Sequence, residues 1–218
     1  MRRQPAQPPE WHLPLERLEP LADGGGIRIR IGGRTLGTVD PGVPAVLALD
    51  VGLPVPPQVR PALERALAEW AACDDGLRLL ARRPYSSAQL ERALRLRHGA
   101  DAAAVALARL RVYLDDGAFA RSWAASRLRA GPRGATALTA GLRQAGVGHV
   151  DTAAAVDAAL AEAGGELALC QTAARRWVAR HGRPADRRAA ARLWAHLARR
   201  GFGGEVISRT LASEGVGE

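Results

Sequence analysis

Lysine is absent from this 218-residue chain, so all 31 of its basic side chains are arginines. The arginine guanidinium is always charged and presents a planar fork that pairs with phosphates and carboxylates. Aromatic residues are also scarce, at 4% of the chain, and much of the apolar content is alanine and leucine. Because alanine and leucine favour helices, the composition predicts a mainly helical protein with thin cores between closely spaced helices.

Cysteines and long apolar runs are few. Cys73 and Cys170 stand too far apart to match a metal-binding or redox motif, and we expect both to be reduced thiols. No apolar run approaches the roughly 18 residues of a membrane span. The basic first residues have no apolar segment behind them, unlike a secretory signal. The sequence therefore predicts a cytoplasmic protein with no membrane partner.

The chain shows no catalytic or cofactor-binding arrangement. Its five histidines are scattered, and the glycine run 24–26 is not followed by a helix, as a phosphate-binding loop would be. The adjacent carboxylates of Asp115 and Asp116 allow two interpretations, metal ligation or helix capping. They stand where a helix is expected to begin and have no histidine at ligand spacing, which favours capping. We expect no enzymatic activity, no metal and no cofactor.

The net positive charge lies in the C-terminal two thirds of the chain. Residues 1–70 hold eight arginines and eight acids, whereas residues 71–218 hold 23 arginines and 14 acids and so carry the whole net charge of +9. A basic segment favours a polyanionic partner, either nucleic acid or an acidic protein surface. The plainer alternative is that many of these arginines only form solvated helix faces.

The candidate contact residues are arginines that cluster near helix ends or on helix faces. Such side chains can hold phosphates or acidic protein surface without reading base sequence, and intrachain ion pairing is the alternative. Trp123, Trp177 and Trp194 can stack on bases, but their apolar neighbours favour core positions. The candidate arginines are Arg82, Arg83, Arg127, Arg129, Arg133, Arg175, Arg176, Arg187, Arg188, Arg199 and Arg200.

The first 72 residues predict a tail and a small β-containing region. Residues 1–26 are rich in proline and glycine and show little periodicity, so they are predicted to form a flexible tail. Residues 27–72 are predicted as a small β-containing region with a linking helix, because isoleucines alternate with arginines at strand period. The expected elements are strands over 27–31, 35–39 and 45–49, a hairpin turn at Gly32-Gly33 and a helix over 61–72.

Residues 73–213 contain a degenerate repeat. In each copy a helical stretch is followed by a proline, then by a second helix with two leucines four residues apart, which lie on one helix face. A glycine then ends the second helix, where a left-handed residue is wanted, and a third short helix follows. The prolines are Pro84, Pro132 and Pro184; the leucine pairs are Leu90/Leu94, Leu138/Leu142 and Leu193/Leu197; the glycines are Gly99, Gly146 and Gly201.

This repeat predicts the fold class. We expect a mainly α protein: an elongated tandem array of three three-helix units that resemble helix-turn-helix modules, preceded by the small β-containing region. The first helices are expected over 75–82, 116–130 and 166–181. The units are expected over about 73–115, 116–163 and 164–213, in a chain that acts as a monomer.

Four motifs in this region resemble those of the RecX family, in the order expected for it. Residues 76–94, GLRLLARRPYSSAQLERAL, resemble the opening of the RecX repeat region, and LDDGAFA at 114–120 resembles its Asp-Asp, two residues, Phe-Ala element. RLRAGPRG at 127–134 resembles its arginine-rich turn, and LARRGF at 197–202 its closing element. The proline-rich start, the missing lysines and a glycine-rich stretch at 141–150 depart from the family. The motif residues expected to be structural are Pro84, Leu90, Asp115, Asp116, Phe119, Gly131, Pro132, Gly201 and Phe202.

The resemblance implies a negative modulator of the RecA recombinase. Members of the family bind RecA filaments on single-stranded DNA, along the groove or at the growing end. They suppress ATP hydrolysis, strand exchange and the co-protease activity of the SOS response. Two alternatives stand beside this hypothesis: an independent transcriptional regulator that binds duplex DNA through its helix-turn-helix-like units, and a helical adaptor whose charge is incidental.

Overall fold

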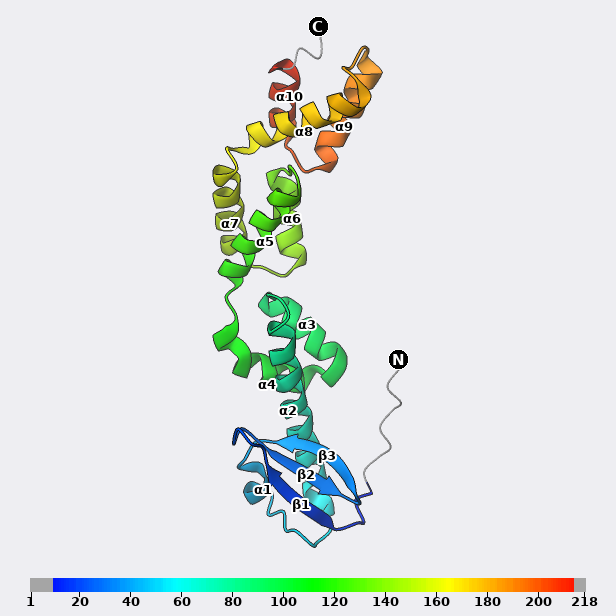
Figure 1. Ribbon diagram of the computed structural model, residues 1–218, viewed down its shortest axis with the longest axis vertical. Helices are drawn as coiled ribbons and strands as arrows, with labels where there is room; N and C mark the ends of the chain where they lie inside the picture. The colour runs from blue at the N-terminus through cyan, green and yellow to red at the C-terminus, as the bar shows by residue number, and fades with distance from the viewer. Residues whose placement is uncertain (1–9, 214–218) are drawn as a thin grey trace. The chain divides into compact units, whose positions relative to one another are not determined.

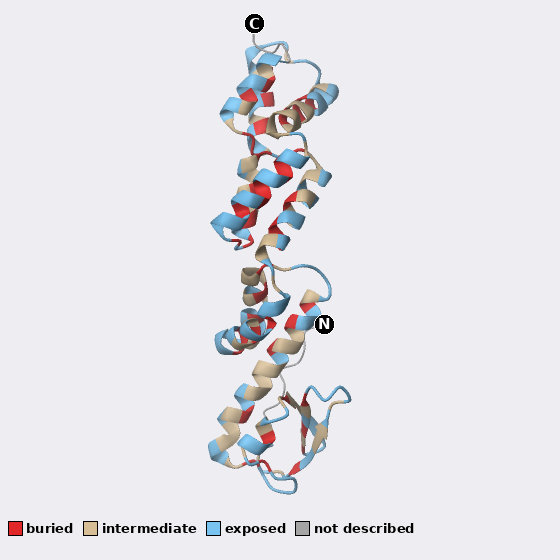
Figure 2. Cartoon of the chain, turned by 90° about the vertical axis from the view of Figure 1, so that its left-hand side faces the viewer, coloured by how far each residue is buried: buried red, intermediate tan, exposed pale blue. Residues whose placement is uncertain are grey.

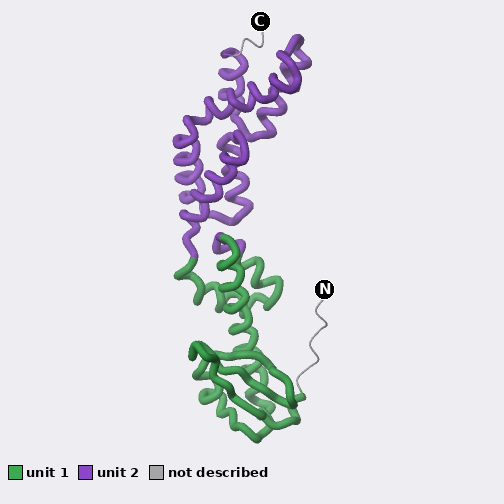
Figure 3. The backbone as a smooth tube through the Cα atoms, viewed as in Figure 1, with its two compact units in different colours: residues 1–83, 90–113 green, residues 84–89, 114–218 purple. Residues whose placement is uncertain are grey.

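The computed structural model describes residues 10–213, and over this range the protein is mainly helical, with one three-stranded sheet and ten α-helices (Figure 1). The chain divides into two compact units (Figure 3). The N-terminal unit comprises the residues up to 83 together with 90–113. The C-terminal unit comprises residues 84–89 together with those from 114 onward. The predicted fold class, mainly helical with a small β-containing start, is confirmed.

An antiparallel sheet opens the N-terminal unit, in the order β1-β2-β3. Ile29 and Ile31 of the central strand are buried, while the alternating arginines face outward. Gly32 and Gly33 both have positive φ and form the predicted tight turn between β2 and β3. The sheet packs its apolar side on Leu63 of α2 and on the loop after β3. The elements are β1 (Leu15–Pro20), β2 (Ile27–Ile31), β3 (Arg34–Val39), α1 (Val43–Val46) and the 3₁₀ helix η1 (Pro57–Val59).

Two predictions for this region are wrong. The strand expected over 45–49 is the short helix α1 and the residues after it, because Pro44 in the first turn fixes a helical φ and cannot donate to a strand ladder. The third strand is instead β1, which lies inside the segment 1–26 predicted as a flexible tail. Leu15 anchors it at 1% exposure. Residues 1–9 of that predicted tail lie outside the described range.

Helix α2 (Arg60–Leu80) connects the sheet to the first three-helix set, α2 to α4 (Figure 1). Its second half packs against α4 (Ala100–Leu110). A side chain at Gly76 would overlap the Leu110 side chain, so glycine allows the two helices to approach closely. In the chain, α3 (Ser87–His98) comes between these two helices, and the 3₁₀ helix η2 (Arg111–Tyr113) extends α4.

The expected break near residue 73 does not exist, because α2 is one continuous helix where two had been predicted, and the domain boundary at 72/73 falls within it. Asp74 and Asp75 therefore do not begin a helix. Asp74 pairs with Arg78 one turn later at 2.6 Å, and Asp75 accepts from His98 of α3 at 2.9 Å. These partners favour acids in the helix interior.

The C-terminal unit contains the second and third three-helix sets. In both, as in the first, the opening helix packs most extensively on the closing one. Buried positions recur along one side of the helices (Figure 2). The second set is α5 (Asp116–Ala130), α6 (Ala135–Gln144) and α7 (His149–Glu162); the third is α8 (Glu166–His181), α9 (Arg187–Arg199) and α10 (Gly204–Ser213).

The predicted repeat residues occupy the expected positions. All six leucines of the three pairs are fully buried, and Gly99, Gly146 and Gly201 have φ values of 83°, 80° and 85° at the ends of the second helices. Phe119 and Phe202 are buried in the second and third cores. Pro132 is buried, Pro84 is exposed, and Gly131 caps the end of α5.

Asp115 and Asp116 both accept hydrogen bonds from backbone amides. The carboxylate of Asp115 accepts from the Ala118 amide at 2.7 Å and caps the start of α5. Asp116 instead accepts from the amide of Ser87 at 2.7 Å. Ser86, fully buried, accepts from the Gln89 amide and donates to the Ala145 carbonyl. The capping interpretation of this acid pair is therefore confirmed for Asp115, while Asp116 has a longer-range role that the sequence does not indicate.

Candidate nucleic-acid interface

The hairpin of α8 and α9 concentrates most of the net charge of the chain. Residues 167–204 contain nine arginines and a single acid, Asp186. In the N-terminal unit, by contrast, acids neutralise arginines in pairs such as Arg95–Glu91 at 3.0 Å and Arg109–Asp40 at 2.8 Å. The carboxylate of Asp186 is already engaged, because it accepts from the Ala189 amide at 2.6 Å as the N-cap of α9. This hairpin is therefore the strongest candidate for contact with a polyanion.

Apolar packing on one side of the hairpin directs its arginines to the other. Leu193 and Leu197 of α9 are fully buried against α8, in a core that also contains Trp177 and Phe202. Helix α8 ends at Gly182, whose positive φ and bond to the Val178 carbonyl reverse the chain toward α9. Periodicity then places the arginines on the outer face. All nine are exposed except Arg200, which is half-buried.

A pocket of about 570 Å³ opens between the two helices. Its wall includes Trp177, which is 8% exposed, stacked on the His181 ring with centroids 4.6 Å apart and planes 19° apart. His181 Nδ1 donates to the Trp177 carbonyl at 2.9 Å. The ionisable side chains that line the pocket are His181, Arg183, Asp186, Arg192 and Arg199.

Arg200 connects the third set to the turn that precedes α6. Its guanidinium donates to the Pro132 carbonyl at 3.1 Å and to His196 Nε2 at 3.1 Å. Its own carbonyl accepts from the Gly134 amide at 3.0 Å. Partial burial, together with the charges of Arg133, Arg176 and Arg180, lowers the pKa of Arg200 below its usual value. These effects show that arginines from α8, α9 and the 131–134 turn gather in one place.

His196 lies among the same cations. Partial burial is the main effect that lowers its pKa, followed by the charges of Arg200 and Arg199, and then of His181 and Arg180. The bond from Arg200 also requires an unprotonated Nε2, because a protonated ring nitrogen cannot accept. The site therefore disfavours additional positive charge and favours an anion.

The structure brings together some of the predicted arginines and separates others. Arg133, Arg176, Arg199 and Arg200 share one basic cluster. Arg187 and Arg188 are exposed in the first turn of α9. Arg82 and Arg83 belong to the N-terminal unit.

The remaining candidates have local partners or a position on α5. Arg127 covers the Trp123 ring at 4.9 Å, with Arg129 exposed in the same last turn of α5. Arg175 donates to the Thr172 hydroxyl at 3.4 Å. Of the tryptophans predicted to be in the core, Trp177 is confirmed, Trp123 is partly buried, and Trp194 is 38% exposed, so its prediction is wrong.

The sequence interpretation missed five residues of this site: Arg180, Arg183, Arg192, His181 and His196. It selected arginines that are adjacent or nearly adjacent in the chain, whereas a helix face collects residues three or four apart. The ratio of arginines to acids over 167–204 is a signal that would have identified the three arginines.

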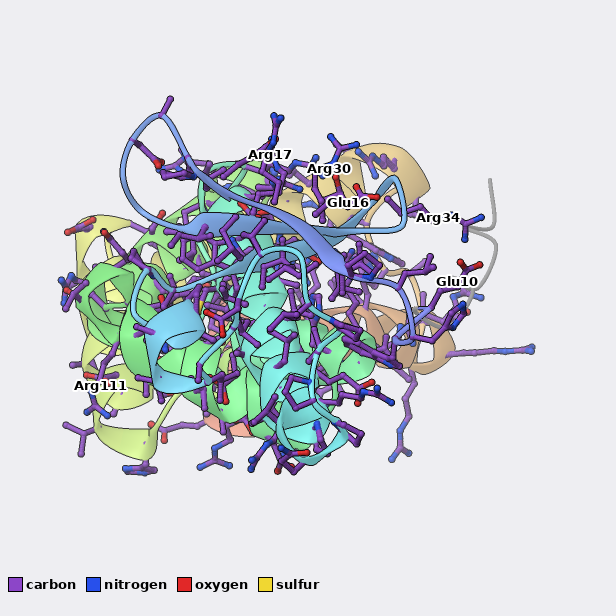
Figure 4. All side chains as sticks on the ribbon, turned by 90° about the horizontal axis from the view of Figure 1, so that it is seen from below. Glu10, Glu16, Arg17, Arg30, Arg34 and Arg111 are labelled. Atoms are coloured by element: carbon purple, nitrogen blue, oxygen red, sulfur yellow. The ribbon has the colours of Figure 1, made fainter. Side chains whose placement is uncertain are left out.

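A second pocket, of about 300 Å³, lies on the sheet and is lined by Glu16, Arg17, Glu19 and Arg30. In Figure 4 the labelled side chains of Glu16, Arg17 and Arg30 extend from the strands. Arg17 pairs with Glu19 at 3.1 Å, and Glu16 accepts from the Gly33 amide at 2.6 Å. Its charges are mixed and paired, so this pocket favours no ligand of one sign.

Over residues 10–213 no three or more histidine, cysteine, aspartate or glutamate side chains are grouped as metal ligands would be. Within the same range, no helix combines the length and the apolar character that crossing a bilayer requires.

Comparison with known proteins finds a matching domain family for each of the two three-helix sets of the C-terminal unit. The family described as the second three-helix domain of RecX matches residues 115–156, and the family described as its third three-helix domain matches residues 165–211. A regulatory protein RecX from Thermobifida fusca (strain YX) is 39% identical over 147 residues, which cover 64% of this chain and 78% of that protein.

Solved structures support the same fold. A crystal structure of a regulatory protein RecX matches with a TM-score of 0.69 and 20% identity, over 90% of this chain and 97% of that one. The crystal structure of RecX from Lactobacillus salivarius matches with a TM-score of 0.55 and 16% identity, over 67% of this chain and 96% of that one. From the sequence identity and the two domain matches together, the chain belongs to the RecX family of regulatory proteins.

Proposed function

We propose that this protein is a non-catalytic negative modulator of RecA. It binds RecA filaments on single-stranded DNA in the cytoplasm and suppresses ATP hydrolysis, strand exchange and SOS co-protease activity. The observation that carries the proposal is the acid-poor arginine surface of α8 and α9, which lies in the region matched by the third RecX domain.

Binding alone accounts for the proposed effect. Guanidinium groups on an exposed helical surface pair with phosphates or with acidic side chains of the filament, and these contacts position the protein without reading base sequence. Arg176, Arg180 and Arg199 are exposed members of the cluster around Arg200 and His196. We assign them to the contact surface and assign Arg200, with its two internal hydrogen bonds, to holding that surface together.

The test is the single-stranded-DNA-dependent ATP hydrolysis of RecA from the same organism, measured as the protein is titrated in. Loss of hydrolysis well below one molecule per RecA protomer supports the proposal and favours capping of the filament end. Loss only near equimolar amounts supports it and favours binding along the groove. Unchanged hydrolysis, with a protein shown to be folded by circular dichroism, contradicts the proposal.

The repeated three-helix sets favour a second candidate, an independent regulator that binds duplex DNA. Each set has a glycine turn before its last helix, as helix-turn-helix modules do. Duplex binding that needs no RecA and prefers one sequence in competition with random duplex would support this candidate. Binding that depends on RecA or ignores duplex sequence would exclude it.

A further inference from the structure

The pocket between α8 and α9 differs from a basic patch because it is concave and has an aromatic wall. Its volume of about 570 Å³ lies within the range of roughly 300–1,000 Å³ typical of sites for small organic ligands. A flat patch contacts a nucleic-acid backbone only along its surface. This pocket can instead receive one nucleotide of a strand or a free small molecule.

Three arginines line the pocket and set the charge of its ligand. Arg183 comes from the turn after α8, while Arg192 and Arg199 project from α9 two turns apart. All three are exposed. Guanidinium groups carried by two elements around one concave space can match the several oxygens of a phosphate group.

The His181 ring provides a rigid aromatic surface. One face of the ring stacks on Trp177, and the bond from Nδ1 to the Trp177 carbonyl holds its orientation. Because Nδ1 is committed to that carbonyl, Nε2 is the ring nitrogen that a ligand can meet. An imidazole braced in this way offers its second face for stacking on a base, which is a sequence-tolerant contact.

Asp186 makes the pocket more than an anion site. One carboxylate oxygen, Oδ1, caps α9 through the Ala189 amide. Asp186 is the only acid among the lining residues, beside three arginines, and its second carboxylate oxygen can accept a hydrogen bond. A simple anion gains nothing from that acceptor, whereas a nucleotide carries sugar hydroxyls or base amino groups that can donate to it.

We propose that this pocket binds a single nucleotide, with its phosphate on Arg183, Arg192 and Arg199, its base stacked on His181, and a sugar or base donor on Asp186. The nucleotide is either free or one residue of a nucleic-acid strand. In the strand form the inference rests on the proposed function, since it names the contact through which the protein would hold single-stranded DNA.

The test monitors the imidazole ¹H–¹⁵N signals of His181 and His196 in the full-length protein without RecA. Three probes are titrated separately: inorganic phosphate, thymidine 5′-monophosphate and a 12-residue thymidine oligonucleotide. We expect the His181 signals to shift with a nucleotide probe, at concentrations well below those at which phosphate has any effect. Saturation by the monophosphate identifies a free nucleotide as the ligand, and saturation by the oligonucleotide alone identifies a strand.

A double variant and a matched control isolate the pocket. Arg183→Gln combined with Arg192→Gln should weaken the nucleotide affinity about tenfold or more, because two charge-assisted contacts are lost. Arg143→Gln combined with Arg209→Gln removes the same charge from exposed positions on α6 and α10 and should leave the affinity within about twofold. The proposal is overturned by equal shifts with inorganic phosphate, by no shift with any probe, or by equal affinity in the two double variants.

The pocket and the proposed function fail in different ways. The imidazole titration contains no RecA, so it reports on the pocket alone. Inhibition of RecA hydrolysis together with silent imidazole signals would overturn the pocket and leave the proposed function standing. Nucleotide binding in a protein that does not inhibit RecA would overturn the proposed function and establish the pocket as a free-nucleotide site.

Discussion

Phe119 and Phe202 are the only phenylalanines in the chain, and each lies in a different three-helix core. Phe119 is 7% exposed beside Leu138 and Leu142, and Phe202 is 4% exposed beside Leu193 and Leu197. Both belong to motifs that resemble RecX. At the residue scale, these motif positions are therefore explained by packing.

Phe119→Ala should act through stability. Removing a buried phenyl ring leaves a cavity, and the free energy of unfolding should fall by about 3 kcal/mol, as measured by urea denaturation. Val150→Ala, at a side chain 79% exposed on α7, is the control and should change it by less than about 0.5 kcal/mol. An unchanged urea midpoint accompanied by loss of RecA inhibition would instead make Phe119 a contact residue.

His196 makes the third set sensitive to acid. Its folded-state pKa lies below the ordinary histidine value of about 6.5. The unfolded chain therefore binds more protons in this range, so the free energy of unfolding decreases as pH falls below about 6.5 and levels off below the folded pKa. His196→Gln keeps an acceptor for Arg200 but cannot be protonated.

The variant should consequently lose less stability than the wild type between pH 7.5 and pH 5.5, as measured by urea denaturation at the two values. Equal losses in the two proteins would show that protonation of His196 does not oppose folding.

At the element scale, local signals predicted the helices well. The leucine pairs, the glycine turns and the helix starts at Asp116 and Glu166 all depend on contacts within one or two turns, and these are visible in sequence. Strand β1 was missed because its stability depends on pairing with β2, and its proline- and glycine-rich surroundings hide that pairing. The continuity of α2 was missed because a helix was expected to begin at Asp75. In the structure, Asp74 and Asp75 lie inside α2, where they pair with Arg78 and His98.

The candidate site was predicted only in part, for a similar reason. Neighbouring arginines are evident in the sequence, but Arg133 reaches the cluster around Arg200 because the amides of Gly134 and Thr136 donate to the carbonyls of Arg200 and Gly201. The two sets are consecutive, but the bonded residues lie about 65 positions apart in the chain. No local pattern indicates such a contact.

Gly134 tests this joint between the second and third sets. A methyl group there would overlap the backbone of Gly201, although its φ of −87° suits any residue. Gly134→Ala should therefore force the two sets apart and destabilise the C-terminal unit by about 1–3 kcal/mol, as measured by urea denaturation.

Gly148→Ala provides the control. Its φ is −62°, and no atom lies within 4 Å of an added methyl group, so the substitution should be neutral or stabilise by up to about 1 kcal/mol. Equal effects of the two substitutions would contradict the packing at the joint.

At the scale of the whole molecule, positive charge is concentrated over residues 167–204. The N-terminal unit pairs several of its arginines with acids, whereas residues 167–204 hold nine arginines and a single acid. The triple variant Arg176→Gln, Arg180→Gln and Arg199→Gln removes three of these charges. Arg121→Gln, Arg143→Gln and Arg209→Gln remove three from other exposed helix positions of the C-terminal unit.

The affinity for single-stranded DNA should fall steeply with salt. Each phosphate contact contributes about −0.7 to the slope of log affinity against log salt concentration, so the first triple variant should have a slope shallower by about 2. Fluorescence anisotropy at several salt concentrations measures this slope. An affinity of the wild type that does not change with salt would show that the protein does not contact DNA phosphates.

The most direct test of the central claim is the concentration of protein that halves the single-stranded-DNA-dependent ATP hydrolysis of RecA, compared among the wild type and the two triple variants. For the triple variant of α8 and α9 this concentration should be about tenfold higher or more, while for the control variant it should stay within about twofold of the wild type. Equal inhibition by all three proteins would contradict the claim, because RecA would then be restrained through another surface.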